Sequence, residues 1–162
     1  MWKFAATACA ALFAAGSAFA QDGVGQAFVS EATSVGLTAI ALGRMADAKS
    51  SNVRIQTLGR DIARDHEAAN EELSRLAGEK DLVLPDTVPA DKDQRGNSFD
   101  SLLGDEFDRR FLEATIRDHA AAITLFDREA ASGADAELRD FARRMLPALR
   151  GHLAAAQALQ SP

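Results

Sequence analysis

Three histidines are the residues of this chain best suited to chemistry, and they are spread over three segments of helical periodicity. His66, His119 and His152 each lie in a stripe of apolar residues that repeats every three or four positions, the spacing of one face of an α-helix. Such a face is buried when helices pack together, so we expect all three imidazoles inside the protein. Facing helices of a bundle are where metal sites are built, and three imidazoles with a nearby carboxylate suit zinc, copper or iron.

Two of the histidines directly follow an aspartate in closely similar contexts. The segments read Arg-Asp-His-Glu-Ala-Ala at 64–69 and Arg-Asp-His-Ala-Ala-Ala at 117–122. Successive helical residues point about 100° apart, so neither aspartate can easily orient the histidine that follows it. Each could instead accept a hydrogen bond from a histidine on a facing helix. The sequence therefore predicts a shared polar network, which would satisfy buried polar groups; its members are His66, His119, His152, Asp65 and Asp118.

The composition excludes several other kinds of site. The only cysteine, Cys9, lies in an apolar N-terminal run, and without it the chain has no disulfide, thiolate nucleophile or zinc–cysteine site. No serine, threonine or lysine accompanies the histidines at a spacing that suggests a nucleophile. We therefore expect no catalytic residues, no enzyme activity, and no cofactor beyond an optional zinc, copper or iron ion.

A carboxylate-bridged di-iron centre is not supported either. That centre needs a Glu-x-x-His motif on each of two helices. Ala63 stands three residues before His66, and Leu149 stands three residues before His152. Any metal would be held mainly by imidazoles.

The first twenty residues have the pattern of a secretory signal peptide. Lys3 is followed by an apolar run over 4–15, and Ala18-Phe19-Ala20 gives the small-x-small cleavage pattern before Gln21. The run is too short to span a bilayer. We expect residues 1–20 to be removed by cleavage near Ala20, and the remaining chain to be periplasmic or otherwise exported.

Four segments show the apolar repeat of amphipathic helices and must position the histidines. Their expected ranges are about 24–49, 52–78, 104–131 and 135–159. Pro147 lies inside the last segment, where we expect it to kink the helix rather than break it. Each helix has one apolar face to bury, so the sequence predicts an all-α, antiparallel four-helix bundle as a single domain over residues 21–162.

The connections favour one order of the helices. Short turns near residues 50 and 133 make two antiparallel hairpins, whereas the stretch between Gly78 and Gly104 could cross the whole bundle at roughly 3.3 Å per residue. We prefer this ferritin-like crossover between the second and third helices over a simple up-down-up-down order. With the crossover, His66 and His119 should be level and His152 roughly one to two turns away.

The charge of the chain bears on its partners. Its formal net charge is −6, and loss of Lys3 leaves 17 basic against 24 acidic residues, a net of −7. A domain this acidic lacks the electrostatic footprint of a nucleic-acid-binding protein and should be repelled by anionic lipid. No second apolar stretch is long enough for a transmembrane helix. A protein partner in the cell envelope stays open, and nothing in the sequence indicates the oligomeric state.

A series of residues over nearly the whole chain follows a recognisable order. It consists of Phe28-Val29, Gly36-Leu37, Leu42-Gly43, Ala46, Asp65-His66, Asn70, Leu73, Leu84-Pro85, Gly104, Phe107-Asp108, His119, Phe126, Glu129, Phe141-Ala142, Leu146-Pro147 and His152-Leu153. This order resembles the domain-of-unknown-function family numbered 4142, exported bacterial proteins often labelled outer-membrane or periplasmic. The resemblance covers roughly Phe28 to Leu159. It implies a ferritin-like bundle, which supports the crossover, and no established enzymatic activity.

Two positions depart from that family. It usually has a glutamate where this chain has Ala39, and a tyrosine where this chain has Phe111. The loss of both polar groups favours a structural or binding bundle. We therefore expect an exported, non-enzymatic helical bundle that binds a partner or contributes to envelope stress tolerance. The alternative is a histidine-based transition-metal-binding protein for storage, buffering or redox work.

Overall fold

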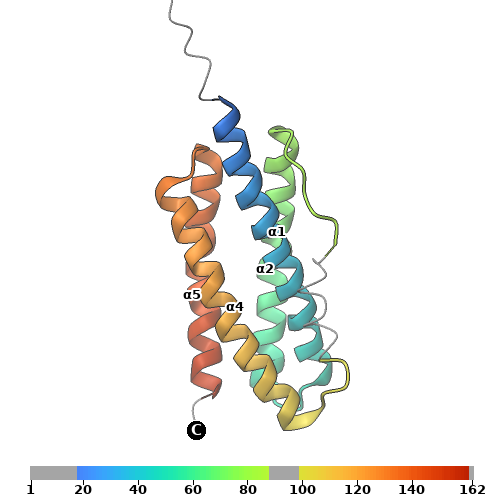
Figure 1. The fold of residues 1–162 in the computed structure, drawn as a ribbon. Coiled ribbons are helices and arrows are strands. Elements are labelled where there is room, and N and C mark those ends of the chain that lie inside the picture. Colours follow the sequence, from blue (N-terminus) through green and yellow to red (C-terminus); the bar gives the residue numbers. More distant parts are fainter. Residues whose placement is uncertain (1–17, 88–98, 161–162) are drawn as a thin grey trace, which may run out of the picture.

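The computed structural model describes residues 18–87 and 99–160 of the chain, and these residues form four long helices and no strand. Figure 1 shows the helices packed side by side along their lengths, in the labelling kept below. The predicted all-α four-helix bundle is therefore confirmed. No helix in the described ranges is long and apolar enough to cross a membrane. The helices are α1 (Ala18–Lys49), α2 (Val53–Glu79), α4 (Gly104–Ser132) and α5 (Ala136–Gln160).

The start of α1 differs from expectation, whereas every other helix end lies within one residue of the expected range. The helix begins at Ala18 instead of near residue 24. Its first residues include alanine, phenylalanine and glutamine but no proline, and alanine and glutamine are good helix formers, so nothing stops the helix at the expected point. The expected signal peptide falls largely on residues 1–17, outside the described residues.

The N-termini of two helices are capped by side chains. The Asn52 side chain accepts a hydrogen bond of 3.0 Å from the backbone N–H two residues on, at the start of α2. At the start of α5, Asp135 Oδ1 accepts bonds of 2.9 Å from the N–H groups of Glu137 and Leu138. Both contacts satisfy donors that a helix cannot satisfy internally. The α5 helix also continues through Pro147 without a break.

The connection between α2 and α4 runs from one end of the bundle to the other (Figure 1). Near the start of α1, the Gln26 side chain exchanges two hydrogen bonds with the backbone of Val83, just after α2. At the other end of α1, Lys49 donates to the carbonyl oxygens of Phe99 and Asp100, just before α4. The α2 and α4 helices therefore point the same way, which confirms the predicted crossover.

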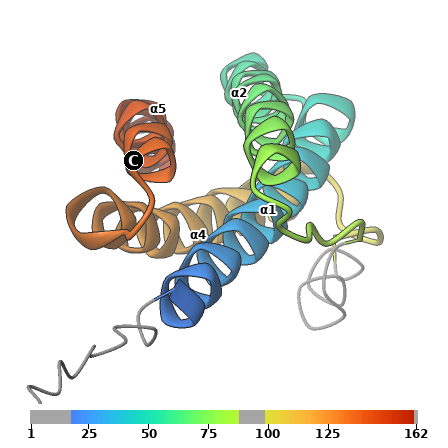
Figure 2. The ribbon, with the colours of Figure 1, turned by 90° about the horizontal axis from the view of Figure 1, so that it is seen from above.

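The order of the helices around the bundle follows from this crossover. The view along the bundle shows α1 between α2 and α4, while α5 completes the ring (Figure 2). The α1 helix packs on α2 and α4, and α5 packs on α4 and α2. Each pair of neighbours is antiparallel, and the two diagonal pairs are parallel. All four helices therefore line one common interior.

The α1 and α2 helices approach each other more closely than ordinary side chains allow. A Cβ atom added to Gly43 would lie 2.5 Å from the Gly59 carbonyl oxygen, and a Cβ on Gly59 would lie 2.5 Å from that of Gly43. Real Cβ atoms do not come this close to backbone, so both positions need glycine. This contact holds α1 against α2, and α1 packs much less extensively against α4.

The buried core has two apolar halves. The half near the α4–α5 turn, called the Phe126 half, includes the aromatic contacts of Phe28 with Phe126 and Phe141. The half near the α1–α2 turn, called the Phe107 half, includes the stacked rings of Phe107 and Phe111. Both halves contain residues from all four helices. The level between the two halves is where the histidines lie.

Candidate metal centre

His66 on α2, His119 on α4 and His152 on α5 meet at this level. Their ring centroids are 5.6 Å apart for His66 and His119, 6.1 Å for His66 and His152, and 5.3 Å for His119 and His152. One ring nitrogen from each histidine lies within 4.8 Å of the other two. The three residues are 2%, 4% and 6% exposed. The fold therefore gathers all the histidines of the chain into one buried cluster.

The three rings meet although His152 is offset from His119 along the bundle, by an amount near the lower end of the one to two turns expected with a crossover. His119 lies 13 positions before the end of α4 at Ser132, and His152 lies 16 positions after the start of α5 at Ala136. The backbone offset is therefore only about 4.5 Å at 1.5 Å per residue. Helical side chains lean toward the N-terminus of their helix, so on these antiparallel helices the two rings lean toward each other. A count of backbone positions leaves out this lean.

Two hydrogen bonds determine where two of the histidines carry their protons. His119 Nδ1 donates to the Thr115 carbonyl oxygen at 3.0 Å, and His152 Nε2 donates to Asp65 Oδ2 at 3.1 Å. Each acceptor is an oxygen that cannot donate, so each of these nitrogens carries the hydrogen. In the neutral rings, the lone pairs are therefore on His119 Nε2 and His152 Nδ1.

These lone pairs have no partner. His119 Nε2 and His152 Nδ1 are buried without a hydrogen bond, and so is His66 Nε2. A buried polar atom left unpaired costs roughly 1–3 kcal/mol, and native proteins rarely tolerate three together. The cluster therefore presents three nitrogens whose natural partner would be a shared ligand.

The polar network expected from the sequence is only partly present. No hydrogen bond joins one histidine ring to another among the described residues, and the one bond within the expected set is His152–Asp65. Asp118 makes no bond to a histidine; it pairs with its neighbour Arg117 at 2.9 Å. The reason is position, because Asp118 lines the side of α4 that faces α1, and α1 carries no histidine.

Burial keeps all three imidazoles neutral near pH 7. It lowers the pKa of His66 to about 3, with a further contribution from the neighbouring His119 and His152. It likewise lowers the pKa of His119 to about 4. Burial also lowers the pKa of His152, although the Asp65 carboxylate opposes this shift. Neutral imidazole is the form that binds a metal ion, so no proton has to leave first.

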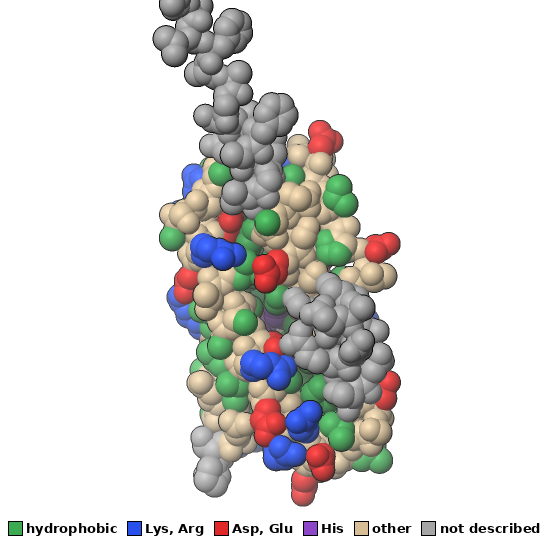
Figure 3. Space-filling model, viewed as in Figure 1, with side chains coloured by type: hydrophobic (Ala, Val, Ile, Leu, Met, Phe, Trp, Pro, Cys, Tyr) green, Lys and Arg blue, Asp and Glu red, His purple; other side chains and the backbone are tan. Residues whose placement is uncertain are grey.

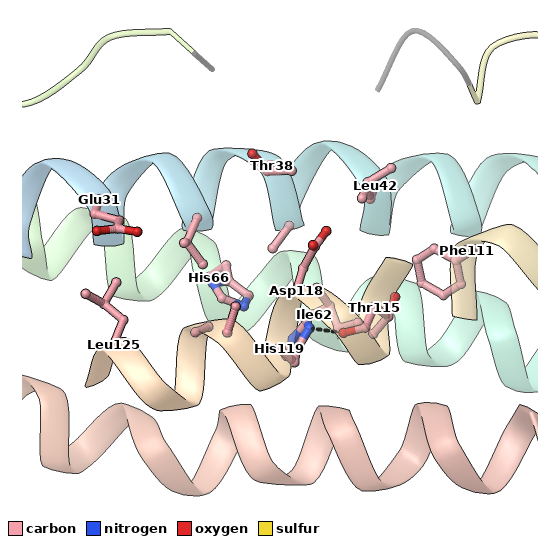
Figure 4. Close-up of a pocket in the computed structure, with 14 residues that line it drawn as sticks. Glu31, Thr38, Leu42, Ile62, His66, Phe111, Thr115, Asp118, His119 and Leu125 are labelled. Atoms are coloured by element: carbon pink, nitrogen blue, oxygen red, sulfur yellow. Dashed lines mark hydrogen bonds between the residues drawn. The ribbon is translucent and has the colours of Figure 1, made fainter. Parts of the chain in front are cut away.

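A cavity of about 240 Å³ reaches the cluster from the side between α1 and α4. Figure 4 shows His66 and His119 on its α2 and α4 walls, and Glu31 and Thr38 on α1. In the space-filling view, histidine atoms are visible at the bottom of a hollow on this face (Figure 3). Ala39 and Phe111, where the resemblance implies glutamate and tyrosine, both line the cavity. His152 does not.

The separation of the histidines is compatible with a metal ion. Zinc–nitrogen bonds are about 2.0–2.1 Å long, which puts two ligand nitrogens of a tetrahedral site about 3.4 Å apart. The three rings, whose nitrogens lie within 4.8 Å, would close on an ion through small side-chain rotations. The Thr115 carbonyl and Asp65 already orient two of them, in the way that outer groups orient metal-binding histidines.

Sequence reasoning missed Thr115 and the cavity. Thr115 lies four positions before His119, so its carbonyl lies on the same helix face, and this spacing is a signal that could have been used. The cavity has no comparable signal, because it depends on how closely α1 is held to α2 and how loosely to α4.

The comparisons with known proteins concern the family and the fold. A family model described as "Domain of unknown function (DUF4142)" matches residues 10–159. The chain is also similar to the crystal structure of a DUF305 fragment from Deinococcus radiodurans, with a TM-score of 0.75 and 15% identity over 85% of this chain and 95% of that chain. At this identity, the likeness extends to the fold alone. No curated protein matches the chain.

Proposed function

The chain belongs to the DUF4142 family of domains of unknown function, and from the geometry of its core we propose that it binds one transition-metal ion through His66, His119 and His152. The set contains three neutral nitrogens, and no carboxylate of the described residues groups with them. Imidazole ligands suit zinc and copper, whereas non-haem iron sites typically add a carboxylate. Zinc or copper is therefore the proposed ion, held without enzymatic chemistry.

The observation that carries this proposal is the set of three unpaired buried nitrogens, one from each ring. A histidine kept only for packing would be expected to use both nitrogens or to be replaced by an apolar residue, since an unpaired polar atom destabilises the fold. Three such atoms, one from each ring of a single cluster, favour a shared ligand. A single metal ion coordinated by all three nitrogens would give each of them a partner.

The groups around the rings support the same conclusion. Metal-binding histidines usually donate their second nitrogen to a carboxylate or a backbone carbonyl, which fixes the tautomer. His152 donates to Asp65, and His119 donates to the Thr115 carbonyl. Both contacts leave the lone pair on the nitrogen that has no other partner. A structural polar network would instead join the rings to one another, and they are not joined.

We also propose that this binding takes place outside the cytoplasm, on the basis of the signal-peptide pattern in residues 1–20. An exported protein with one buried site and no thiol would suit storage or buffering of the ion. Partner binding and envelope stress tolerance, expected from the sequence, are compatible with that role.

Metal titration of the mature protein tests the proposal. The chain starting at Gln21 is purified without a histidine tag, freed of metal with a chelator, and titrated with Zn²⁺, Cu²⁺ and Fe²⁺ by calorimetry. We expect one ion per chain for zinc or copper with a Kd below about 10 μM. All histidines of the chain are in the cluster, so no other histidine contributes.

Two variants make this test specific. His66→Leu should abolish the binding, whereas Glu72→Gln should not, because Glu72 pairs with Arg144 on the outer surface of α2 and α5. A Kd above about 10 μM for every ion, or binding that survives in His66→Leu, would show that the proposal is wrong.

A further inference from the structure

We propose that the metal centre keeps one coordination position directed into the cavity between α1 and α4, and that this position takes a small neutral ligand with an N–H or O–H group. Water is the simplest such ligand, and a neutral nitrogen base can replace it. This inference rests on the proposed metal site and specifies the class of ligand that the bound ion would take.

The ring of protein ligands around the cluster is incomplete. Three of the four helices each contribute one imidazole, and α1 contributes none. At this level α1 presents only small or apolar side chains to the cavity, namely Val35, Thr38 and Ala39. Three protein ligands with a fourth, exchangeable position describe an open zinc site, whereas closed structural sites have four protein ligands.

The open position faces the cavity. His66 and His119 line the cavity, and His152 lies on the other side of them, held by Asp65. An ion bound by all three rings would therefore have its protein ligands on the α2, α4 and α5 sides. Its remaining position would point toward α1, into the cavity (Figure 4).

The size of the cavity suits a small ligand. The cavity measures about 240 Å³, and a water molecule takes up about 30 Å³ in the liquid. There is room for several waters or for one molecule the size of imidazole. The cavity is smaller than the roughly 300–1,000 Å³ of typical sites for drug-sized ligands, so its size suits a small ligand.

The charge of the lining selects a neutral ligand over an anion. Among the described residues that line the cavity, Glu31 and Asp118 are the charged ones, and both are acidic. A divalent ion with three neutral imidazoles carries two positive charges, which these carboxylates partly offset, since Asp118 also pairs with Arg117. An anionic ligand would add a negative charge to a region already lined by them. Asp118 is also placed to accept a hydrogen bond from a ligand in the cavity.

Cobalt substitution tests the open position. Co²⁺ is loaded in place of zinc, and its visible absorption spectrum is followed while imidazole or azide is added. We expect a saturable spectral change with imidazole, and at least about tenfold weaker binding of azide because of the acidic lining. In Asp118→Asn, the difference between the two ligands should shrink by at least about threefold. Cobalt content measured after gel filtration distinguishes ligand binding from removal of the ion.

Two variants at one position test whether the ligand enters through the cavity. Ala39→Leu fills space on the α1 wall and contributes no ligand atom, so cobalt should stay bound and the imidazole response should weaken at least about tenfold. Ala39→Ser is the matched control and should keep the response.

The outcomes separate the two proposals. If cobalt does not bind at all, the proposed function itself fails. If cobalt binds but its spectrum responds to neither ligand, or imidazole only strips the ion from the protein, the open position is overturned. Azide binding as tight as imidazole overturns the ligand class, and an unchanged response in Ala39→Leu overturns entry through the cavity.

Discussion

The Asp65-His66 and Asp118-His119 pairs have nearly the same local sequence and different structural surroundings. Asp65 lies where α2 faces α5, and it accepts a hydrogen bond from His152. Asp118 lies where α4 faces α1 and lines a cavity. Both aspartates also pair with the arginine before them, Arg64 or Arg117. The two histidines are similar in burial and point into the same cluster.

The difference shows that the facing helix decides what each aspartate does. Where α5 supplies a histidine, the aspartate becomes an acceptor that orients a ring. Where α1 supplies Ala39 and Thr38, the equivalent aspartate faces open space. The same dipeptide therefore lies on a closed side of the cluster at Asp65 and on an open side at Asp118. Variants of the two aspartates test this contrast, and variants of the two histidines test what the pairs have in common.

The largest expected effect is a fall in the free energy of unfolding in acid. Both His66 and His119 should contribute to it, to different extents. In the metal-free fold, the pKa of His66 is about 3 and that of His119 about 4, against about 6.5 in the unfolded chain. The unfolded state therefore binds more protons below pH 6.5, and the stability present above that pH is lost as the pH falls. For His66 alone we expect a loss on the order of 4 kcal/mol by pH 3.

Urea denaturation of the metal-free protein between pH 7 and pH 3 measures this loss, and His66→Leu provides the comparison because it removes the titrating group. The difference between the two proteins should grow as the pH falls. A constant difference would contradict the prediction. NMR titration of the histidine rings should also show His66 protonating at lower pH than His119.

Replacing either of the two histidines should weaken metal binding to a similar degree, since each supplies one ligand. We expect His66→Leu and His119→Leu each to raise the zinc Kd by more than about 100-fold, beyond what the loss of an outer-sphere group causes. Their metal-free stability at pH 7 should be unchanged or higher, because each change removes an unpaired buried nitrogen. Calorimetry and urea denaturation measure both quantities. A large effect in only one variant would mean that the two histidines do not share the ion.

Asp65→Asn should have an intermediate effect. The change keeps an oxygen that can accept from His152 but removes the negative charge, and outer groups of this kind typically alter metal affinity by about 10–100-fold. We expect the lower end, about tenfold weaker zinc binding at pH 7, measured by calorimetry. If zinc affinity does not change, Asp65 has no part in orienting the site.

Asp118→Asn should have the smallest effect on the metal. Among the described residues, Asp118 bonds to Arg117, whose side chain is 57% exposed, and exposed ion pairs contribute about 0–1 kcal/mol. We expect zinc affinity within about threefold of the unchanged protein and stability within about 0.5 kcal/mol. The same titration and urea series check both values. If this variant weakens zinc binding as much as Asp65→Asn, the two aspartates play equal roles and the contrast between the pairs fails.

Much of the fold could be predicted because its signals are local. The apolar repeat that contains Ile62, His66 and Ala69 predicts a helix and its buried face, and equivalent repeats mark the other helices. The crossover followed from chain length, since the stretch after Gly78 is long enough to return along the bundle. The start of α1 was placed too late, because no proline separates residues 18–23 from the apolar repeat that follows.

The candidate site was predictable only in its residues. Inward-facing positions identify His66, His119 and His152, but the meeting of their rings depends on side-chain lean across antiparallel helices. Whether Asp118 contacts a histidine depends on which helix lies opposite. The cavity depends on the Gly43–Gly59 contact between α1 and α2. These are properties of packing between segments far apart in the chain, which one segment's periodicity does not contain.

The absence of a ligand on α1 has a consequence for motion. An ion at the cluster would cross-link α2, α4 and α5, and its binding free energy would oppose every local opening that separates these three helices. It would not oppose the movement of α1 away from α4. Fluctuation of α1 would therefore persist in the loaded protein, and backbone amide exchange should slow on three helices more than on the fourth. The ion could therefore enter and leave when α1 moves, because α1 supplies no ligand to it.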